Sequence, residues 1–444
     1  MMKDLKAHFD AVSGRALAEL LPGERAAVSY TAELTSFMRF NNGKVRQSGT
    51  VEQADLGIKL WKGAKSYSFQ LCLSGDGARD EDRVAEAIGH ARATMPLLPD
   101  DQYQAVPEAA ESSDARYAGK LLPENEIPKR VLGPAEGLDF TGLYSQGLVC
   151  RAAANSAGAR HWFQTETFIV DYSAWLPNGR AVKSSYAGRE WSADEYAARI
   201  QSTRRSLENL HKPEKALSPG KYRAFITADA LNEVVTFFSW NGFGERGLRQ
   251  GESAYIAMKE GRETMSPKFG FSQDFTLGVQ PAFNDDGELA PERLPIVAAG
   301  KIRNTIVCSR TAKQYGLPAN GAGEGEDVRS VSIDAGDLPE AEALKALGTG
   351  VYVSNFHYLN WSDVQAARVT GMTRFSCLWV ENGQIVGPIK DMRWDESLYN
   401  MLGAKLEAVT KERHLLVETA TYEHRQVGGS LLPGILVDGL SFTL

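Results

Sequence analysis

The segment ALNEVVTFFSW, residues 230–240, is where the sequence comes nearest to a known metal-binding pattern. Its apolar residues recur at the spacing of one helical face, which predicts a helix. A metallopeptidase helix carries histidines around a glutamate, because zinc needs several ligands that converge on one point. Here Asn232 and Phe237 stand where histidines would be needed, and only Glu233 has a suitable side chain. The segment therefore predicts a helix without a metal site.

The seven histidines offer no replacement for the missing ligands. The closest two, His414 and His424, are ten residues apart, so no pair has the spacing that places two imidazoles on one helical face. A site assembled from residues far apart in the sequence stays possible at this point.

The cysteines form no CxxC pair, and we expect free thiols in a reducing compartment. They are Cys72, Cys150, Cys308 and Cys377.

Three further segments contain fragments of known motifs. GAGEGED, residues 321–327, lacks the Lys-Ser/Thr of a phosphate-binding loop and predicts a flexible loop. NDDGELAPE, residues 284–292, lacks the alternating ligands of a calcium loop and predicts a turn. GESAY, residues 251–255, fails the last position of a nucleophile elbow.

Cys377 and His357 could form a nucleophile and its base, because both are predicted in strands of the same half. Cys377, however, alternates in phase with Phe375 and Trp379, which indicates a thiol that faces the core. The pattern therefore favours a structural cysteine over a catalytic one.

SNFHYLNW, residues 354–361, is rich in polar and aromatic residues for a strand. Such a strand can border a groove and pair with an extended peptide by β-addition. Asn355, His357 and Asn360 are accordingly our candidates for contact with a peptide. The alternative is that His357 is a structural histidine whose ring is hydrogen-bonded within the fold.

The overall composition is that of a soluble globular protein. The chain has 444 residues, of which 43% are hydrophobic, and this length predicts two or three domains. A net charge of −7 argues against binding nucleic acid, which needs a basic surface. We find no apolar segment typical of a signal peptide, and no apolar run of the roughly 18 residues that a membrane helix requires. We therefore expect a cytoplasmic protein that does not contact a membrane.

The N-terminal half alternates helical and strand patterns. Helices are predicted near both ends of the first hundred residues, with two β-hairpins between them. The proline-rich segment 96–135 predicts a connector with little regular structure. Strands at 163–176 and 179–188 precede the clearest helix, in which Ser192 and Glu195 form a capping box.

Strand patterns dominate after the Pro- and Gly-containing segment 211–222. Two helices interrupt them, at 228–240 and around 395–409, and one of the predicted strands is 303–310. Asp438-Gly439 lies between two apolar runs, which predicts a two-residue hairpin.

These elements predict an α+β fold with two domains. The N-terminal domain, residues 1–210, is expected to have antiparallel strands flanked by helices. The C-terminal domain, residues 221–444, is expected to be rich in strands.

Several motifs carry a resemblance to a known family. TGMTRF at 370–375 and ENGQIVGPI at 381–389 follow the strand GVYV at 350–353. This block resembles the TldD/PmbA family of cytoplasmic bacterial and archaeal proteins. FMRFNNGKVRQSG at 37–49 is similar to the family's opening domain, so the resemblance covers nearly the whole chain. Residues 300–345 preserve only part of the family's Gly-Asn-Ala-rich segment.

The resemblance implies two branches with different chemistry. In the TldD branch, the histidines of an HExxxH helix and a cysteine near the C-terminus bind zinc, and the glutamate is the general base toward the zinc-bound water. In this chain Asn232, Glu233 and Phe237 match the motif positions, and residues 422–434 contain no cysteine. The chain therefore resembles the zinc-free PmbA/TldE branch, with Glu233 as the remnant of the motif.

Membership of that branch implies a non-catalytic subunit without a cofactor of its own, which pairs with a zinc-bearing TldD-type subunit or with itself. The complex would be a hollow peptidase that acts on short or unfolded peptides, and the older family label, modulator of DNA gyrase, would describe an indirect effect. Two alternatives stay open. One is a stand-alone peptidase or hydrolase that uses Glu233, His357 or Cys377, and the other is a homo-oligomeric peptide-binding protein.

Overall fold

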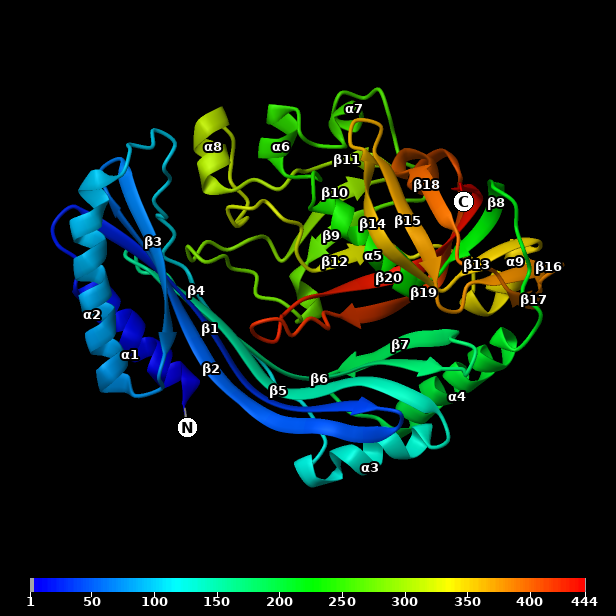
Figure 1. Ribbon diagram of the computed structural model, residues 1–444. Helices are drawn as coiled ribbons and strands as arrows, with labels where there is room; N and C mark the ends of the chain where they lie inside the picture. Colours follow the sequence, from blue (N-terminus) through cyan, green and yellow to red (C-terminus); the bar gives the residue numbers. More distant parts are fainter. Residues whose placement is uncertain (1–3, 444) are drawn as a thin grey trace.

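The computed structural model describes residues 4–443, which form two β-sheets with helices packed around them (Figure 1). The N-terminal sheet has the strand order β3-β2-β1-β5-β6-β4, with β7 beside β6. Its neighbouring strands are antiparallel except for β4, which runs parallel to β6. The elements of this half are α1 (Leu5–Ala18), β1 (Glu24–Asn41), β2 (Lys44–Lys62), β3 (Lys65–Leu73), α2 (Gly77–Thr94), β4 (Ser112–Tyr117), α3 (Ile127–Leu132), β5 (Asp139–Asn155), β6 (Arg160–Trp175), β7 (Ala181–Gly188) and α4 (Ala193–Leu210).

The long strands β1, β5 and β6 separate apolar from polar residues by alternation, because successive side chains point to opposite faces. Even-numbered Tyr30 and Trp162 are buried with α1 and α2, and even-numbered Phe140 and Tyr172 are buried with α3 and α4. Odd-numbered residues such as Glu33 lie on the opposite face. That concave face curves around the C-terminal half (Figure 1).

The C-terminal sheet is built around β20, which pairs with β8, β12, β18 and β19. Its apolar residues form one large core with α5. Both halves together confirm the predicted α+β class. The elements are β8 (Gly220–Ile226), α5 (Ala228–Val235), α6 (Glu245–Gln250), α7 (Ile256–Lys259), β9 (Phe271–Asp274), β10 (Arg293–Ala298), β11 (Lys301–Ile302), α8 (Ser309–Tyr315), β12 (Val331–Ile333), α9 (Ala343–Leu347), β13 (Gly350–Val353), β14 (Asn355–Asp363), β15 (Arg368–Arg374), β16 (Leu378–Glu381), β17 (Gln384–Pro388), β18 (Arg393–Ser397), β19 (Leu406–Val417) and β20 (Gly429–Phe442).

Several local predictions are wrong. The expected helix around 395–409 is β18, one helical turn at Asn400–Ala404, and the start of β19. Its apolar residues have helical spacing because that turn is buried between the two strands. The expected strand 303–310 is irregular chain that leads into α8, and the connector 96–135 contains β4 and α3.

Asp438-Gly439 does not form a hairpin. Both residues lie inside β20, where the register to β8 shifts between Val437 and Leu440. Gly439 has a positive φ of 96°, so the pair forms a bulge, and the strand continues because Leu440 is buried in the same core.

The capping box at the start of α4 is half formed. Ser192 Oγ accepts a hydrogen bond from the Glu195 backbone N–H at 3.3 Å. Tyr186 takes the place of the reciprocal bond between the Ser192 N–H and the Glu195 side chain. The Ser192 N–H donates to the Tyr186 hydroxyl at 3.0 Å, and this hydroxyl donates to the Glu195 carboxylate at 3.2 Å.

Among residues 4–443, no helix has the length and apolar character needed to cross a membrane.

Candidate functional site

Helix α5 carries the segment that came nearest to a metal-binding motif. The Thr227 side chain caps its first turn at 3.2 Å from the Ala230 N–H and also donates to the Ser354 carbonyl at 2.9 Å, which attaches the helix to the start of β14. Leu231 and Val234 are fully buried in the core of the C-terminal sheet. The helix is therefore held rigidly, with Glu233 on its exposed side.

The position expected for a second zinc-binding histidine belongs to the core. Phe237 is 1% exposed, and its ring lies 5.6 Å from that of Trp240 and 4.6 Å from that of Trp361. Asn232, at the first histidine position, is half-buried. In the described part of the chain, no three His, Cys, Asp or Glu side chains come close enough to hold a metal ion. The donor set around α5 does not fit zinc.

Glu233 lies within electrostatic range of the N-terminal sheet. Loss of solvent raises the pKa of its carboxyl, the positive charge of Lys183 on β7 lowers it, and the negative charge of Glu418 raises it further. Lys183 also lies 3.8 Å from Asp171 of β6, whose pKa is raised by burial. We use the name inter-sheet groove for the region between the two sheets that contains these charged groups, Asp171, Lys183, Glu233 and His357; of the four, Asp171 lines a cavity.

His357 is the fourth group of this groove. Loss of solvent lowers the pKa of its imidazole, the positive charges of Arg374 and Lys183 lower it further, and the carboxylate of Asp391 opposes them. The same lysine therefore acts on Glu233 and on His357. Tertiary structure thus brings together one acid, one base and one cation from three separate elements.

The three candidates for peptide contact lie on one face of β14. Asn355 is half-buried, and His357 and Asn360 are exposed. Between His357 and Asn360 the strand advances three residues while β15 advances two, because Tyr358 forms a bulge with a φ of 56°. The extra residue restores all three side chains to the same face. Their role in binding stays a prediction.

Two strands that border the groove have a free edge. Among residues 4–443, β14 pairs with β15 alone and β7 pairs with β6 alone. Strand edges present unpaired backbone N–H and C=O groups, which can pair with an added strand. β7 and β14 therefore each have an edge to which a further strand could be added.

Cys377 and His357 do not form a nucleophile and base. Cys377 is 1% exposed. Its thiol donates hydrogen bonds to the carbonyl oxygens of Arg374, at 3.3 Å, and Asn355, at 3.6 Å. Burial raises the pKa of the thiol, which keeps it protonated.

A large cavity adjoins the groove on the concave face of the N-terminal sheet. It has a volume of about 1010 Å³, and it shares Asp171 with the groove. The loop between β19 and β20 reaches into it and is held by Arg425, whose backbone N–H donates to Glu33 at 3.1 Å and whose Nη2 donates to the Gly147 carbonyl at 3.2 Å. Neither Arg425 nor Lys183 was expected, because each is an isolated basic residue without a local motif.

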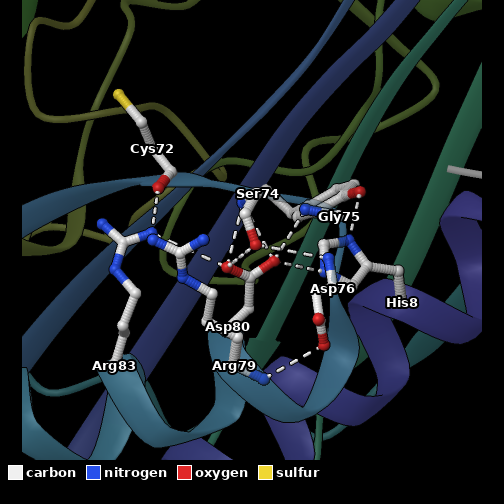
Figure 2. Close-up of polar contacts among 9 residues, drawn as sticks. His8, Cys72, Ser74, Gly75, Asp76, Arg79, Asp80 and Arg83 are labelled. Atoms are coloured by element: carbon white, nitrogen blue, oxygen red, sulfur yellow. Dashed lines mark hydrogen bonds and ion pairs between the residues drawn. The ribbon is translucent and has the colours of Figure 1, made fainter. Parts of the chain in front are cut away.

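A second polar cluster, which the sequence pattern also missed, lies beneath α1 and α2 (Figure 2). The fully buried Asp80 accepts hydrogen bonds from the backbone N–H groups of Ser74 and Gly75, both at 2.9 Å, and lies 3.1 Å from His8 Nε2. His8 Nδ1 in turn lies 3.2 Å from the hydroxyl of the buried Tyr30. Asp, His and Tyr are in the order of a proton relay, but all three are buried, so the cluster joins α1, α2 and β1 structurally.

A family model described as the PmbA/TldA metallopeptidase C-terminal domain matches residues 219–444, half of the chain. The chain belongs to the TldD/PmbA family. No match was found among curated proteins.

Solved structures of TldD/PmbA-type proteins share the whole fold. TldE from Thermococcus kodakarensis is 14% identical with a TM-score of 0.75, covering 98% of this chain and 100% of its own. A proposed modulator of DNA gyrase from Thermotoga maritima is 15% identical with a TM-score of 0.75, covering 99% and 100%. One from Bacteroides thetaiotaomicron is 14% identical with a TM-score of 0.77, covering 100% of both chains. At these identities the likeness concerns the fold.

Proposed function

We propose that this chain is a zinc-free, TldE-like subunit of a cytoplasmic TldD/TldE-type metallopeptidase, which holds extended peptides without cutting them. The observation that carries the proposal is the state of α5 and of the 3-10 turn Thr236–Phe238 that follows it. Phe237 fills an aromatic cluster where the family's zinc helix would present an imidazole, and Asn232 replaces the other one. Zinc is therefore expected only in a TldD-type partner.

The inter-sheet groove supports the peptide-holding part of the proposal. Its two bordering edges, β7 and β14, offer backbone hydrogen bonds that do not depend on the peptide's sequence. Lys183, Glu233 and His357 supply charges of both signs along the groove. A site of this kind suits short or unfolded segments of varied sequence.

The test is co-expression with a TldD-type protein from the same source, followed by native mass spectrometry and elemental analysis of each subunit. We expect a complex of the two chains, with stoichiometric zinc only in the TldD-type subunit. Stoichiometric zinc bound by this chain would contradict the zinc-free assignment. If no such protein associates and the chain forms only homo-oligomers, the subunit role fails and the alternative of a self-assembled peptide-binding protein takes its place.

A stand-alone hydrolase is a second candidate, favoured by one observation. Desolvation raises the pKa of Glu233 in a groove that also contains His357, and raised carboxyl pKa values are typical of general acids and bases. Purified protein without a partner should then cleave peptides, and Glu233→Gln should abolish that activity. Absence of cleavage by the wild-type chain alone removes this candidate.

A further inference from the structure

A second, smaller cavity lies away from the inter-sheet groove. It has a volume of about 320 Å³ and is enclosed between β2 and β3 of the N-terminal sheet and the loops around α6 and α8 of the C-terminal half. None of its lining residues belongs to the larger cavity. Both acidic segments singled out in the sequence, 284–292 and 321–327, contribute to its wall.

Most charged groups of this cavity are already paired. Lys59 forms an ion pair with Glu324, and Arg310 forms one with Asp101. The Glu288 carboxylate accepts a hydrogen bond from the Ser309 hydroxyl at 2.5 Å. These pairs neutralise one another and leave little net charge to attract a simple ion.

Two lining groups of opposite charge are unpaired. Within residues 4–443, the guanidinium of Arg246 and the carboxylate of Asp286 each have no hydrogen bond or ion pair, although both side chains line the cavity. The Arg246 backbone N–H donates to Glu326 at 2.7 Å, which holds its residue in place. Burial raises the pKa of Asp286 to about 6; the positive charge of Lys59 lowers it, and the negative charges of Glu288 and Glu324 raise it further.

Two neutral groups of the wall are also without partners. Trp61 is 1% exposed and Gln104 is 8% exposed, and both line the cavity. The indole N–H of Trp61 and the amide oxygen of Gln104 have no partner in the part of the chain that is described. The Gln104 amide nitrogen lies 3.2 Å from the carbonyls of Gly63 and Lys65, which fixes the orientation of the amide. Both atoms are closed off from the cavity by the packing around them, so these two residues shape its wall and do not present a polar group to its interior.

We propose that this cavity binds a small zwitterion of the α-amino acid class, either a free amino acid or a dipeptide. The carboxylate of the ligand pairs with Arg246 and its ammonium group with Asp286, and the Trp61 ring forms part of the wall. A simple anion would leave Asp286 unpaired, and a metal cation would leave Arg246 unpaired, whereas a zwitterion satisfies both. The volume is that of a small-ligand pocket. This site is independent of the function proposed for the groove.

The test is isothermal titration calorimetry of the full chain with L-alanine, L-glutamate, L-lysine and L-alanyl-L-alanine, and with capped forms of the best binder, N-acetylated or C-amidated. We expect at least one free compound to bind, and each cap to weaken binding by at least about tenfold, because each removes one of the two charges. Failure of every free compound to bind at millimolar concentration overturns the proposal. So does equal binding of the capped forms.

Two variants locate the ligand. Arg246→Met and Asp286→Asn should each weaken binding by at least about tenfold, whereas the matched surface changes Arg205→Met and Asp82→Asn should leave it unchanged. If either cavity variant fails to fold, Ser66→Phe replaces it, since this change narrows the cavity without altering its charges. Binding that survives these changes in the wall places the ligand elsewhere and overturns the site.

Discussion

At the scale of single residues, Phe237 and Glu233 lie close in sequence but in different surroundings. Phe237, in the 3-10 turn Thr236–Phe238, is part of an aromatic cluster, whereas Glu233 is exposed on α5. Because the Phe237 ring is buried, its contribution to the fold can be measured as a change in the free energy of unfolding.

We expect Phe237→Ala to lower the free energy of unfolding by about 3–5 kcal/mol, the usual cost of removing a buried aromatic ring. Tyr358→Ala, at a position 84% exposed on neighbouring β14, should change it by less than about 0.5 kcal/mol. Urea denaturation followed by circular dichroism measures both. Equal losses would mean that the aromatic cluster does not stabilise the fold.

Asp80 is the second residue with a measurable contribution. Burial by itself would raise the pKa of its carboxyl, but hydrogen bonds from Ser74, Gly75 and His8 hold the pKa below its ordinary value of 3.8. A lowered carboxyl pKa contributes stability above the unfolded pKa, and this contribution is lost as the pH falls through the folded pKa.

We therefore expect Asp80→Asn to destabilise the protein by about 1–3 kcal/mol at neutral pH, and the difference from wild type to shrink below about pH 4. Urea midpoints of both proteins over a pH series give this difference. The exposed Asp82→Asn is the matched control. A difference that grows on acidification would show that the Asp80 carboxylate is not stabilised in the folded state.

At the scale of elements, β14 combines an exposed edge with a bulge at Tyr358 that keeps Asn355, His357 and Asn360 on one face. If a peptide adds to this edge, its backbone contributes more than any one side chain of β14.

We expect N-methylation of alternate peptide amides, those that face β14, to weaken binding by at least about tenfold, because each removes a backbone donor. His357→Ala should weaken it less. Fluorescence anisotropy with labelled peptides measures both effects, and methylation of the intervening amides is the control. Equal sensitivity at every position would exclude addition to a strand edge.

The elements also show where sequence patterns suffice. The period-2 and period-3.6 patterns predicted β6, β7 and α4, because apolar residues recur in each at the spacing of its secondary structure. They failed at 395–409, where a buried turn has the residue spacing of a helix, and at Asp438-Gly439, where a bulge has the residue pair of a hairpin turn. In both places long-range pairing in the C-terminal sheet outweighs the local signal.

At the scale of the whole molecule, the curved N-terminal sheet places Lys183 against two groups of the C-terminal half. Its positive charge lowers the pKa of Glu233 and of His357. The packing of one half on the other can therefore be detected by titrating a residue in only one of them.

We expect Lys183→Ala to raise the pKa of His357, because a neighbouring positive charge that disfavours the imidazolium is removed. The His357 Cε1 proton resonance followed by NMR through a pH titration measures this shift. Lys44→Ala, at an exposed end of β2, should have no effect. An unchanged His357 pKa in Lys183→Ala would mean that the two sheets do not face each other in this way in solution.

The sequence by itself determined the α+β class and the absence of histidines from the helix that contains Glu233, since both depend on residue types and local spacing. Tertiary structure alone decided that the charge of Lys183 lowers the pKa of Glu233, and that Arg246 and Asp286 line one cavity. Local patterns record which face of an element is buried. They do not record which distant element covers that face, because that choice depends on the packing of many contacts at once.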